Sequence, residues 1–478
     1  MGRRILLTAR WVIGHAAGAH VIHEQGVVVI ENGAVLHVGP SFDGEVAERI
    51  DYGQAVISPG LVDLDALADL DTTILGYDNS PAWKKGRVWP ESYVARGPYE
   101  MYGPEELAFQ KRHAFAHLIR NGITTALPIS SLFYREWAET VAEFDAAAEA
   151  AADLGLRVYL GPAYRSGGQV TDDQGRITAR YDEARGLAGL EEAAAFAARI
   201  EGRAGGLIRA MFAPDRIETC TPALLQRTAA LAAELGAPVR QHCCQSPTEL
   251  RLVQEQHGTS PIVWLDRLGV LGPRWLLPHG TQATEADFDH LAASGAALVH
   301  CPLVSARHGS MLGSFARCRD RGIVTGLGTD TFPADMILNM QVGMMMARMV
   351  DGTEAVRSEH LFDAATLGGA QALGRPDLGR LAPGARADIA VIDLRHVLQT
   401  PDPVQTLMTS ASGRDTRDVW IDGRRVMRDG VIPGVDALAD AARAQAQFDG
   451  LVTKYPDRTA GHPPVQDIFR PSYERRDA

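Results

Sequence analysis

The sequence is short of cysteine and of aromatic residues. Aromatic residues make up only 6% of the 478 positions, and the five cysteines include no Cys-x-x-Cys pair. An odd number of cysteines without paired spacing excludes a disulfide framework and a cysteine-ligated zinc site, and it favours a reducing compartment. The cysteines are Cys220, Cys243, Cys244, Cys301 and Cys318.

Long apolar runs are also missing. No stretch approaches the ~20 apolar residues that a membrane helix needs. The first 20 residues begin like a signal peptide, but Arg10 interrupts the apolar run and no cleavage motif follows. We therefore expect a soluble cytoplasmic protein with no membrane partner.

Basic residues are fewer than acidic ones. The chain has 47 basic and 59 acidic residues, for a net charge of −12. An acidic surface repels phosphate backbones, so a nucleic-acid partner is not expected. The balance leaves a small molecule as the expected partner.

What the sequence does contain is ordered β and βα patterning. Residues 1–58 read as short strands, and from about 104 to 370 helical segments that end at glycine alternate with short apolar runs. Eight such runs over 59–374 predict an α/β fold, a distorted (β/α)8 TIM barrel. Strand character returns over 375–435, so both chain ends are predicted to form one small β-sandwich. The helical tail, 436–478, shows no obvious partner within the chain, and we expect a homodimer or higher homo-oligomer.

Catalytic groups of such a barrel lie at the carboxyl ends of its strands. Two imidazoles and two carboxylates that meet there form a divalent-metal site, which lowers the pKa of bound water. A single buried histidine is as often a core residue, but placement at several strand ends favours a site. The polar residues at the predicted ends are Asp65, Tyr164, Arg165, Asp215, Glu218, His242, His279, His300 and Asp330.

Seven motifs carry a resemblance to a known family. In this order and spacing they resemble the amidohydrolase superfamily, in the branch with guanine, cytosine and S-adenosylhomocysteine deaminases and triazine hydrolases, over about residues 5 to 430. The motifs are ISPGLVDL (57–64), NGITTA (121–126), PVRQH (238–242), LLPHGTQAT (276–284), VHCPLVSA (299–306), GLGTD (326–330) and GRLAPGARADIAVID (379–393).

The resemblance implies roles for three residues. His242 matches a metal-binding histidine, His279 one that binds the metal or its water, and Asp330 an aspartate that binds metal and accepts a proton from the attacking water. It also implies a barrel with a small β-sandwich built from both chain ends.

Two positions depart from the family pattern. The family carries His-x-His after the first strand, where this chain has Asp65 and Leu67; leucine cannot ligate a metal, whereas the aspartate can supply one oxygen. Deaminases of this branch carry a glutamate three residues after His242 as a proton shuttle. Gln245 stands there, and an amide orients a carbonyl but transfers no proton.

Three interpretations follow. In the first, Asp65, His242, His279 and Asp330 bind one divalent metal, zinc before manganese, iron or cobalt, with Asp330, His279 and Gln245 as catalytic residues. The enzyme then hydrolyses a non-peptide C–N bond of an amide, urea, carbamate or substituted heterocycle. The second is a metal-independent acid/base enzyme using His242, His279 and Asp330, and the third is a non-catalytic small-molecule binding protein. The acidic cluster Asp63, Asp69 and Asp71 could offer a substitute ligand; alternatively, Asp63 belongs to the PGLVD pattern, and Asp69 and Asp71 cap the next helix.

Substrate-binding residues are predicted in the loops that follow the strand ends. The insertion 74–102 is rich in aromatic and basic residues, and Trp83 and Trp89 are candidates to stack on a planar ligand; the alternative is a structural or dimer-contact loop. Arg165 is a candidate to clamp a carboxylate, or else to pair with Asp215. Tyr164, Arg307 and His308 complete the predicted substrate-binding residues.

Overall fold

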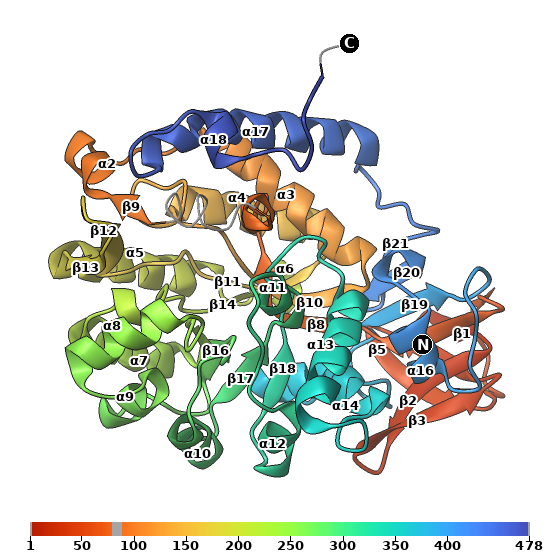
Figure 1. Ribbon diagram of the computed structural model, residues 1–478. Coiled ribbons are helices and arrows are strands. Elements are labelled where there is room, and N and C mark those ends of the chain that lie inside the picture. The colour runs from red at the N-terminus through yellow and green to blue at the C-terminus, as the bar shows by residue number, and fades with distance from the viewer. Residues whose placement is uncertain (1, 79–87, 477–478) are drawn as a thin grey trace.

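The computed structural model of the chain describes residues 2–78 and 88–476. Two four-stranded parallel sheets lie at its centre (Figure 1), with helices outside them. One sheet has the order β8 (Leu61–Leu67), β10 (Ile123–Ile129), β11 (Arg157–Leu160), β14 (Ile208–Ala210). The other has the order β15 (Val239–Arg240), β16 (Trp275–Pro278), β17 (Ala297–His300), β18 (Thr325–Leu327).

The two sheets continue into each other at both edges. Phe212, just after β14, forms a parallel bridge with Val239 of β15. Asp330, after β18, donates its backbone N–H to the Asp65 carbonyl of β8 over 2.8 Å. The eight strands thus follow one another around a ring in sequence order, which is the topology of the predicted (β/α)8 barrel.

Capping residues set the ends of the barrel helices. Thr140 and Thr221 accept backbone N–H groups at the starts of α4 and α7, and Gly155 and Gly236 end these helices in the left-handed conformation. No helix of the described residues is long and apolar enough to cross a membrane. Helices outside the barrel strands include α3 (Pro104–Arg120), α4 (Val141–Leu154), α5 (Glu183–Ile200), α7 (Pro222–Leu235), α8 (Pro247–His257), α9 (Pro261–Arg267), α10 (Glu285–Ser294) and α13 (Met336–Asp351). They also include α11 (Pro302–Arg307), α12 (Phe315–Asp320), α14 (Ser358–Asp363) and α16 (Pro403–Thr409).

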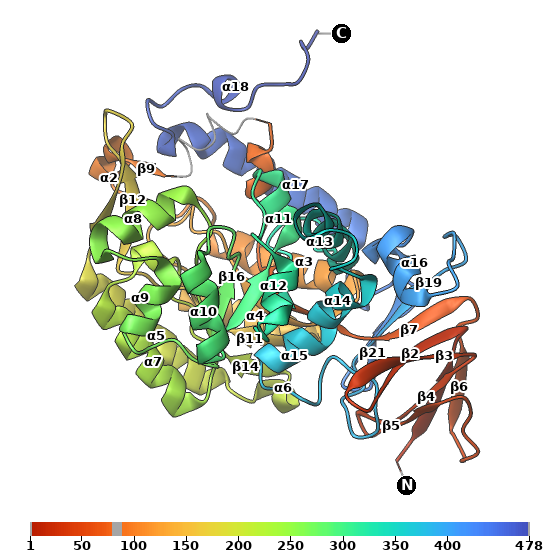
Figure 2. The same cartoon turned by 60° about the horizontal axis from the view of Figure 1, so that its bottom comes forward.

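Both chain ends build a second β unit beside the barrel (Figure 2). A four-stranded sheet has the order β5 (Ala34–Gly39), β4 (Val27–Glu31), β1 (Arg4–Thr8), β6 (Glu48–Asp51). A six-stranded sheet has the order β21 (Arg424–Met427), β20 (Thr416–Ile421), β19 (Ile389–Asp393), β7 (Ala55–Pro59), β2 (Trp11–Ala16), β3 (Ala19–Glu24). Val28, Ile57 and Trp420, from both sheets, share one apolar core. The predicted pairing of the two ends is therefore seen in the β7–β19 ladder.

Two consecutive strands divide between the second β unit and the barrel. β7 belongs to the second β unit, and β8 enters the barrel. Gly60 lies between the two strands. Only glycine fits at this position, because a Cβ there would lie 2.1 Å from the Thr124 hydroxyl oxygen. The predicted boundary between 58 and 59 falls inside β7.

The helical tail packs on its own chain, contrary to the expectation that it lacks a partner there. Helix α17 (Ala437–Arg458) lies along α3 (Figure 1), and Gln110 donates to Gln447 over 3.1 Å. Leu451 and Tyr455 are buried in a cluster with Trp89 and neighbouring aromatic residues. The amphipathic face of the tail is thus covered within one chain, so it gives no reason to expect association.

Candidate active site

The four predicted ligands meet at the carboxyl ends of the barrel strands. One ligand atom each from Asp65, His242 and His279 lies within 4.8 Å of the other two. The His242 Nε2 is 3.8 Å from Asp65 Oδ2, and the His279 Nε2 is 3.7 Å from Asp330 Oδ2. The two imidazole rings stack with centroids 5.2 Å apart. The structure therefore brings together four of the nine polar residues that the strand-end rule selected.

These four residues fit a divalent cation. Two imidazole nitrogens and two carboxylate oxygens are suitable donors for zinc and similar ions. Donors around a tetrahedral zinc ion lie roughly 3.3 to 3.5 Å apart. The two pairs above are 3.7 and 3.8 Å apart, and the ligand atoms of Asp65, His242 and His279 lie within 4.8 Å of one another, so the ligands must move closer together to bind an ion. Leu67, at the second position of the missing His-x-His, lines the cavity with an apolar side chain.

The acidic residues around Asp65 fix the chain beside Asp330. Asp63 accepts hydrogen bonds from the Thr329 N–H and hydroxyl, and Asp71 accepts them from the Thr331 hydroxyl and the Phe332 N–H. Asp330 itself has a φ of 43°, a conformation that non-glycine residues rarely adopt. Asp63 and Asp71 therefore anchor the segment that holds Asp330 rather than act as substitute ligands.

Asp69, the remaining acidic candidate, is engaged elsewhere. Its Oδ2 accepts hydrogen bonds from the Ser131 N–H and the Tyr134 hydroxyl. Burial raises the pKa of this carboxyl to about 6. Asp69 lines the cavity, but its contacts tie the loop after β10 to the loop after β8. Among the described residues Asp69 makes no capping contact, whereas Asp71 accepts a 2.7 Å hydrogen bond from the N–H of Thr73, the first residue of the short helix Thr73–Gly76.

Burial dominates the ionisation of the ligand set. It raises the pKa of Asp65 and Asp330 and lowers the pKa of His242. The Arg240 guanidinium opposes the pKa rise at Asp65 and adds to the fall at His242. The lowered pKa keeps the His242 imidazole neutral, which is the form that binds a metal. A protonated carboxyl must lose its proton to a bound cation, so metal affinity is expected to rise with pH.

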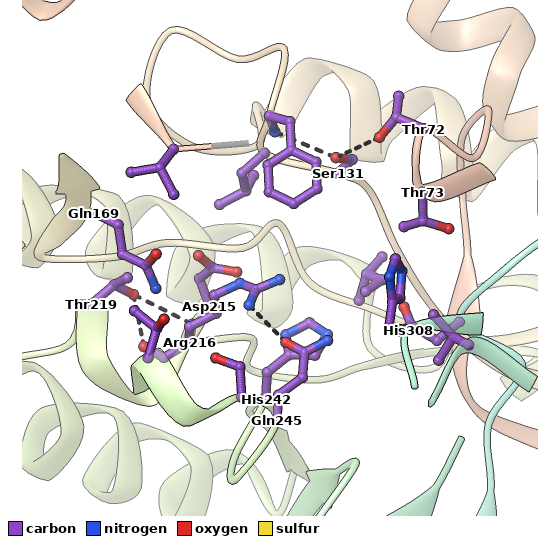
Figure 3. Close-up of a pocket in the computed structure, with 18 of the residues that line it drawn as sticks. Thr72, Thr73, Ser131, Gln169, Asp215, Arg216, Thr219, His242, Gln245 and His308 are labelled. Atoms are coloured by element: carbon purple, nitrogen blue, oxygen red, sulfur yellow. Dashed lines mark hydrogen bonds between the residues drawn. The ribbon is translucent and has the colours of Figure 1, made fainter. Parts of the chain in front are cut away.

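A cavity of about 580 Å³ lies above the ligand set. His242, Gln245 and Asp330 line it, together with Arg216 and Asp215 from the segment after β14. Figure 3 shows Arg216 reaching Gln245 beside His242, with His308 across the cavity. A space of this size is in the range of small-molecule sites.

Gln245 is held from two sides. Its side-chain oxygen accepts a 2.7 Å hydrogen bond from the Arg216 Nη1 (Figure 3). Both carboxylate oxygens of buried Glu249 accept backbone N–H groups, those of Cys244 and Gln245. With its oxygen engaged, the Gln245 amide presents its N–H groups as donors.

Arg165 lies in the cavity wall between two indole rings. Its guanidinium carbon is 4.9 Å from the Trp89 ring centroid and 5.1 Å from that of Trp137. The residue is 7% exposed, and its Nε and Nη2 have no hydrogen-bond partner among the described residues. Burial lowers the pKa of this guanidinium to about 10. No ion pair joins it to Asp215 within 4 Å in the described part of the chain, so the predicted pairing is not formed.

Two predicted substrate-binding residues point away from the cavity. The Tyr164 hydroxyl is buried against α7, 2.9 Å from the Thr228 hydroxyl. The Arg307 Nη1 donates to the Thr331 hydroxyl and the Phe332 carbonyl. Both residues support the fold, and only Trp89, Arg165 and His308 of the predicted set line the cavity. Trp83 lies outside the described residues.

Other polar residues at strand ends are also structural. His300 is buried near Phe315, and burial lowers the pKa of its imidazole to about 4. Glu218 is buried beside the cavity and accepts a hydrogen bond from Gln169. Neither lines the cavity among the described residues.

Sequence reasoning missed two arginines of the site. Arg240 donates from Nη1 to Asp65 Oδ1 over 2.6 Å, with both side chains buried. Arg216 binds Gln245. The available signal for Arg240 was its place two residues before His242, because alternate residues of a strand face the same side.

A barrel with imidazoles and carboxylates at its strand ends is the architecture of a metal-assisted hydrolase class. The amidohydrolase family profile matches residues 73–426, and the chain belongs to that family. It is 31% identical over 428 residues to a 5-methylthioadenosine/S-adenosylhomocysteine deaminase of Nitratidesulfovibrio vulgaris, which covers 86% of this chain and 89% of the relative. A deaminase of the same name from Natronomonas pharaonis is 28% identical over 89% of this chain and 93% of its own.

Solved structures show the same fold. A zinc-bound adenosine deaminase from Xanthomonas campestris has a TM-score of 0.75 at 24% identity, over 93% of this chain and 98% of its own. A zinc-complexed atrazine chlorohydrolase from Arthrobacter aurescens has a TM-score of 0.74 at 21% identity, over 93% of this chain and 100% of its own. The predicted family is therefore confirmed, and the protein is a hydrolase of C–N bonds other than peptide bonds that acts on a small molecule.

Proposed function

We propose that the protein is a metal-dependent amidohydrolase that cleaves an amide, urea, carbamate or substituted heterocycle. The observation that carries the proposal is the convergence of Asp65, His242 and His279, with Asp330 beside His279, next to a cavity of about 580 Å³ that His242 and Asp330 line. Four donors from four strand ends suit one divalent ion. Zinc is the ion that we propose, and two solved relatives of this fold hold it.

We infer the ligand roles from the geometry. Asp65 through Oδ2, His242 and His279 through their Nε2 atoms, and Asp330 would hold the ion. Such an ion, when bound, acidifies a coordinated water and so supplies a nucleophile at neutral pH. Asp330, at the cavity surface, is placed to accept that proton on its carboxylate, and nearby His279 helps to hold the reacting groups in place.

Gln245 is proposed to orient the substrate. Its oxygen is engaged by Arg216, so its N–H groups remain to donate to a carbonyl oxygen or a ring nitrogen. An amide carries no ionisable proton, so this residue does not replace the shuttle glutamate expected of deaminases in this branch. That difference favours amide, urea or carbamate hydrolysis over deamination of a purine ring, although the relatives are named as deaminases.

Trp89, Arg165 and His308 are proposed to bind the rest of the substrate. The indole of Trp89 gives a flat apolar wall, and the buried Arg165 guanidinium beside it has unpaired donors. Burying a cation without a hydrogen-bonded partner costs free energy, which an anionic ligand group offsets. We therefore expect substrates with a carboxylate or similar oxyanion.

Metal analysis tests the proposal. The wild-type protein is expected to bind one zinc ion per chain, and Asp330→Asn is expected to lose most of it along with hydrolytic activity. Asp289→Asn, at an aspartate whose side chain is 71% exposed, is the matched control and should change neither. Aryl ureas, carbamates, carboxylated amides and aminated heterocycles form the substrate screen. Activity without bound metal would favour the acid/base alternative, and inactivity with ligand binding would favour a binding protein; either result contradicts the proposal.

A further inference from the structure

Arg240 stands inside the barrel, next to the ligand set. It is the last residue of β15, two positions before His242, and it is 1% exposed. Its Nη1 donates to Asp65 Oδ1 over 2.6 Å, and the side chains of this ion pair are 1% and 0% exposed. A charged hydrogen bond this short, shielded from water, fixes the direction of a carboxylate strongly.

The two oxygens of Asp65 have different surroundings. Oδ1 faces the Arg240 guanidinium, whereas Oδ2 lies 3.8 Å from the His242 Nε2 and accepts a weak hydrogen bond from the Cys301 thiol at 3.6 Å. A carboxylate has about four lone-pair positions, so Oδ2 retains the capacity to bind a cation. The guanidinium therefore leaves the inward-facing oxygen available.

The fixed charge of Arg240 stabilises the ionised carboxylate of Asp65 in a buried site that also holds Asp330. A guanidinium by itself repels a bound cation, so Arg240 favours zinc binding only through the position that it gives the carboxylate. The guanidinium does not itself compete for the inward-facing oxygen. Residues that orient a ligand from behind in this manner typically change metal affinity by about 10- to 100-fold.

We propose that Arg240 is a positioning residue, which holds Asp65 through Oδ1 so that Oδ2 completes the cation site with His242 and His279. This inference rests on the proposed function. The Arg240–Asp65 pair then supplies a metal ligand at the position where the family has the first-strand histidines. The alternative is an ion pair that only stabilises the barrel.

Zinc affinity measured by chelator competition tests the proposal in five proteins. Wild type, Arg240→Met, Arg240→Lys, Asp65→Asn and the double variant Arg240→Met/Asp65→Asn are compared, and zinc-dependent thermal stabilisation is the second readout. We expect Arg240→Met to weaken zinc binding about 10- to 100-fold and Arg240→Lys to retain part of the affinity. The double variant should bind no more weakly than Asp65→Asn, because Arg240 acts through that carboxylate.

The matched control is another buried ion pair. Arg157, at the start of β11, binds Asp388 over 3.1 Å with side chains 2% and 3% exposed, at the opposite end of the strands. Arg157→Met should lower stability without changing zinc affinity. Unchanged affinity in Arg240→Met, additive losses in the double variant, or an equal loss in Arg157→Met would overturn the inference. If wild type itself binds no zinc, the proposed function fails instead.

Discussion

Arg216 donates a 2.7 Å hydrogen bond to the side-chain oxygen of Gln245. Both residues line the cavity, on the side of His242 (Figure 3). The contact decides which face of the amide meets a ligand, because an engaged oxygen leaves the N–H groups directed elsewhere. Gln245 is thus expected to act as a fixed hydrogen-bond donor.

Loss of that contact should slow the reaction without unfolding the protein. Arg216→Met frees the amide to rotate, and a hydrogen bond to a charged group contributes about 1.5 to 3 kcal/mol. We expect kcat/KM on the best substrate of the screen to fall roughly 10- to 100-fold, with zinc content unchanged. Arg251→Met is the control, because its guanidinium binds Glu255 on the surface of α8. Equal activity of Arg216→Met and wild type would contradict the orienting role.

Replacement of Arg165 is expected to affect both the stability of the protein and its binding of an anion. Arg165→Met removes a buried charge with unpaired donors, so the gain in solvation free energy offsets the loss of contacts with Trp89 and Trp137. We expect a Tm at or above that of wild type. Malonate, a small dicarboxylate probe, should raise the Tm of wild type but not that of the variant.

The control for this experiment is a second arginine in contact with the Trp137 indole. Arg185 stacks on Trp137 at 4.7 Å and pairs with Glu136. Arg185→Met should keep the response to malonate. A malonate response of equal size in Arg165→Met would show that the anion binds elsewhere.

The site could be predicted only in part, and Tyr164 and Arg165 show why. Both follow the third barrel strand, but neighbouring residues of an extended chain point in opposite directions. Only Arg165 faces the cavity, while the Tyr164 hydroxyl meets Thr228 of α7. Strand ends were predictable from apolar runs and glycines, whereas the direction of a side chain in the following loop was not.

Long-range ion pairs could not be predicted from the sequence for a similar reason. Arg240 and Asp65 are 175 residues apart, and nothing local to either residue specifies the other. The barrel topology brings β8 and β15 to one interior, and the pair is visible only then. His242, His279 and Asp330 were predictable because each stands at a strand end within a recognisable motif.

The buried carboxyl of Glu139 makes stability depend on pH. Its oxygens accept the N–H groups of Ser130 and Ala163, and burial, with the nearby Glu143 carboxylate, raises its pKa from 4.5 to about 7. The folded state therefore binds the proton more tightly than the unfolded state, so stability falls as pH rises from about 4.5 through 7. A shift of this size corresponds to about 3 kcal/mol.

Glu139→Gln should reduce that dependence, because the amide resembles the protonated acid. Urea unfolding at pH 5 and pH 8 is expected to show a smaller loss of stability in the variant than in wild type, by up to about 3 kcal/mol. Glu136→Gln, at a residue whose side chain is 53% exposed, serves as the control and should keep the wild-type slope. Parallel pH profiles for Glu139→Gln and wild type would contradict the assignment.

The tail helix links stability to substrate binding. Leu451 of α17 is fully buried among aromatic residues that include Trp89, and Arg458 of the same helix lines the cavity. Leu451→Ala is expected to destabilise the fold by about 2 to 5 kcal/mol, because it leaves a cavity in that cluster. KM should rise more than kcat falls, since the metal ligands are on the barrel strands and the tail forms only the wall. Leu438→Ala, at the exposed start of the helix, should change neither quantity. An unchanged KM in Leu451→Ala, measured on protein shown to be folded, would mean that the tail has no part in the site.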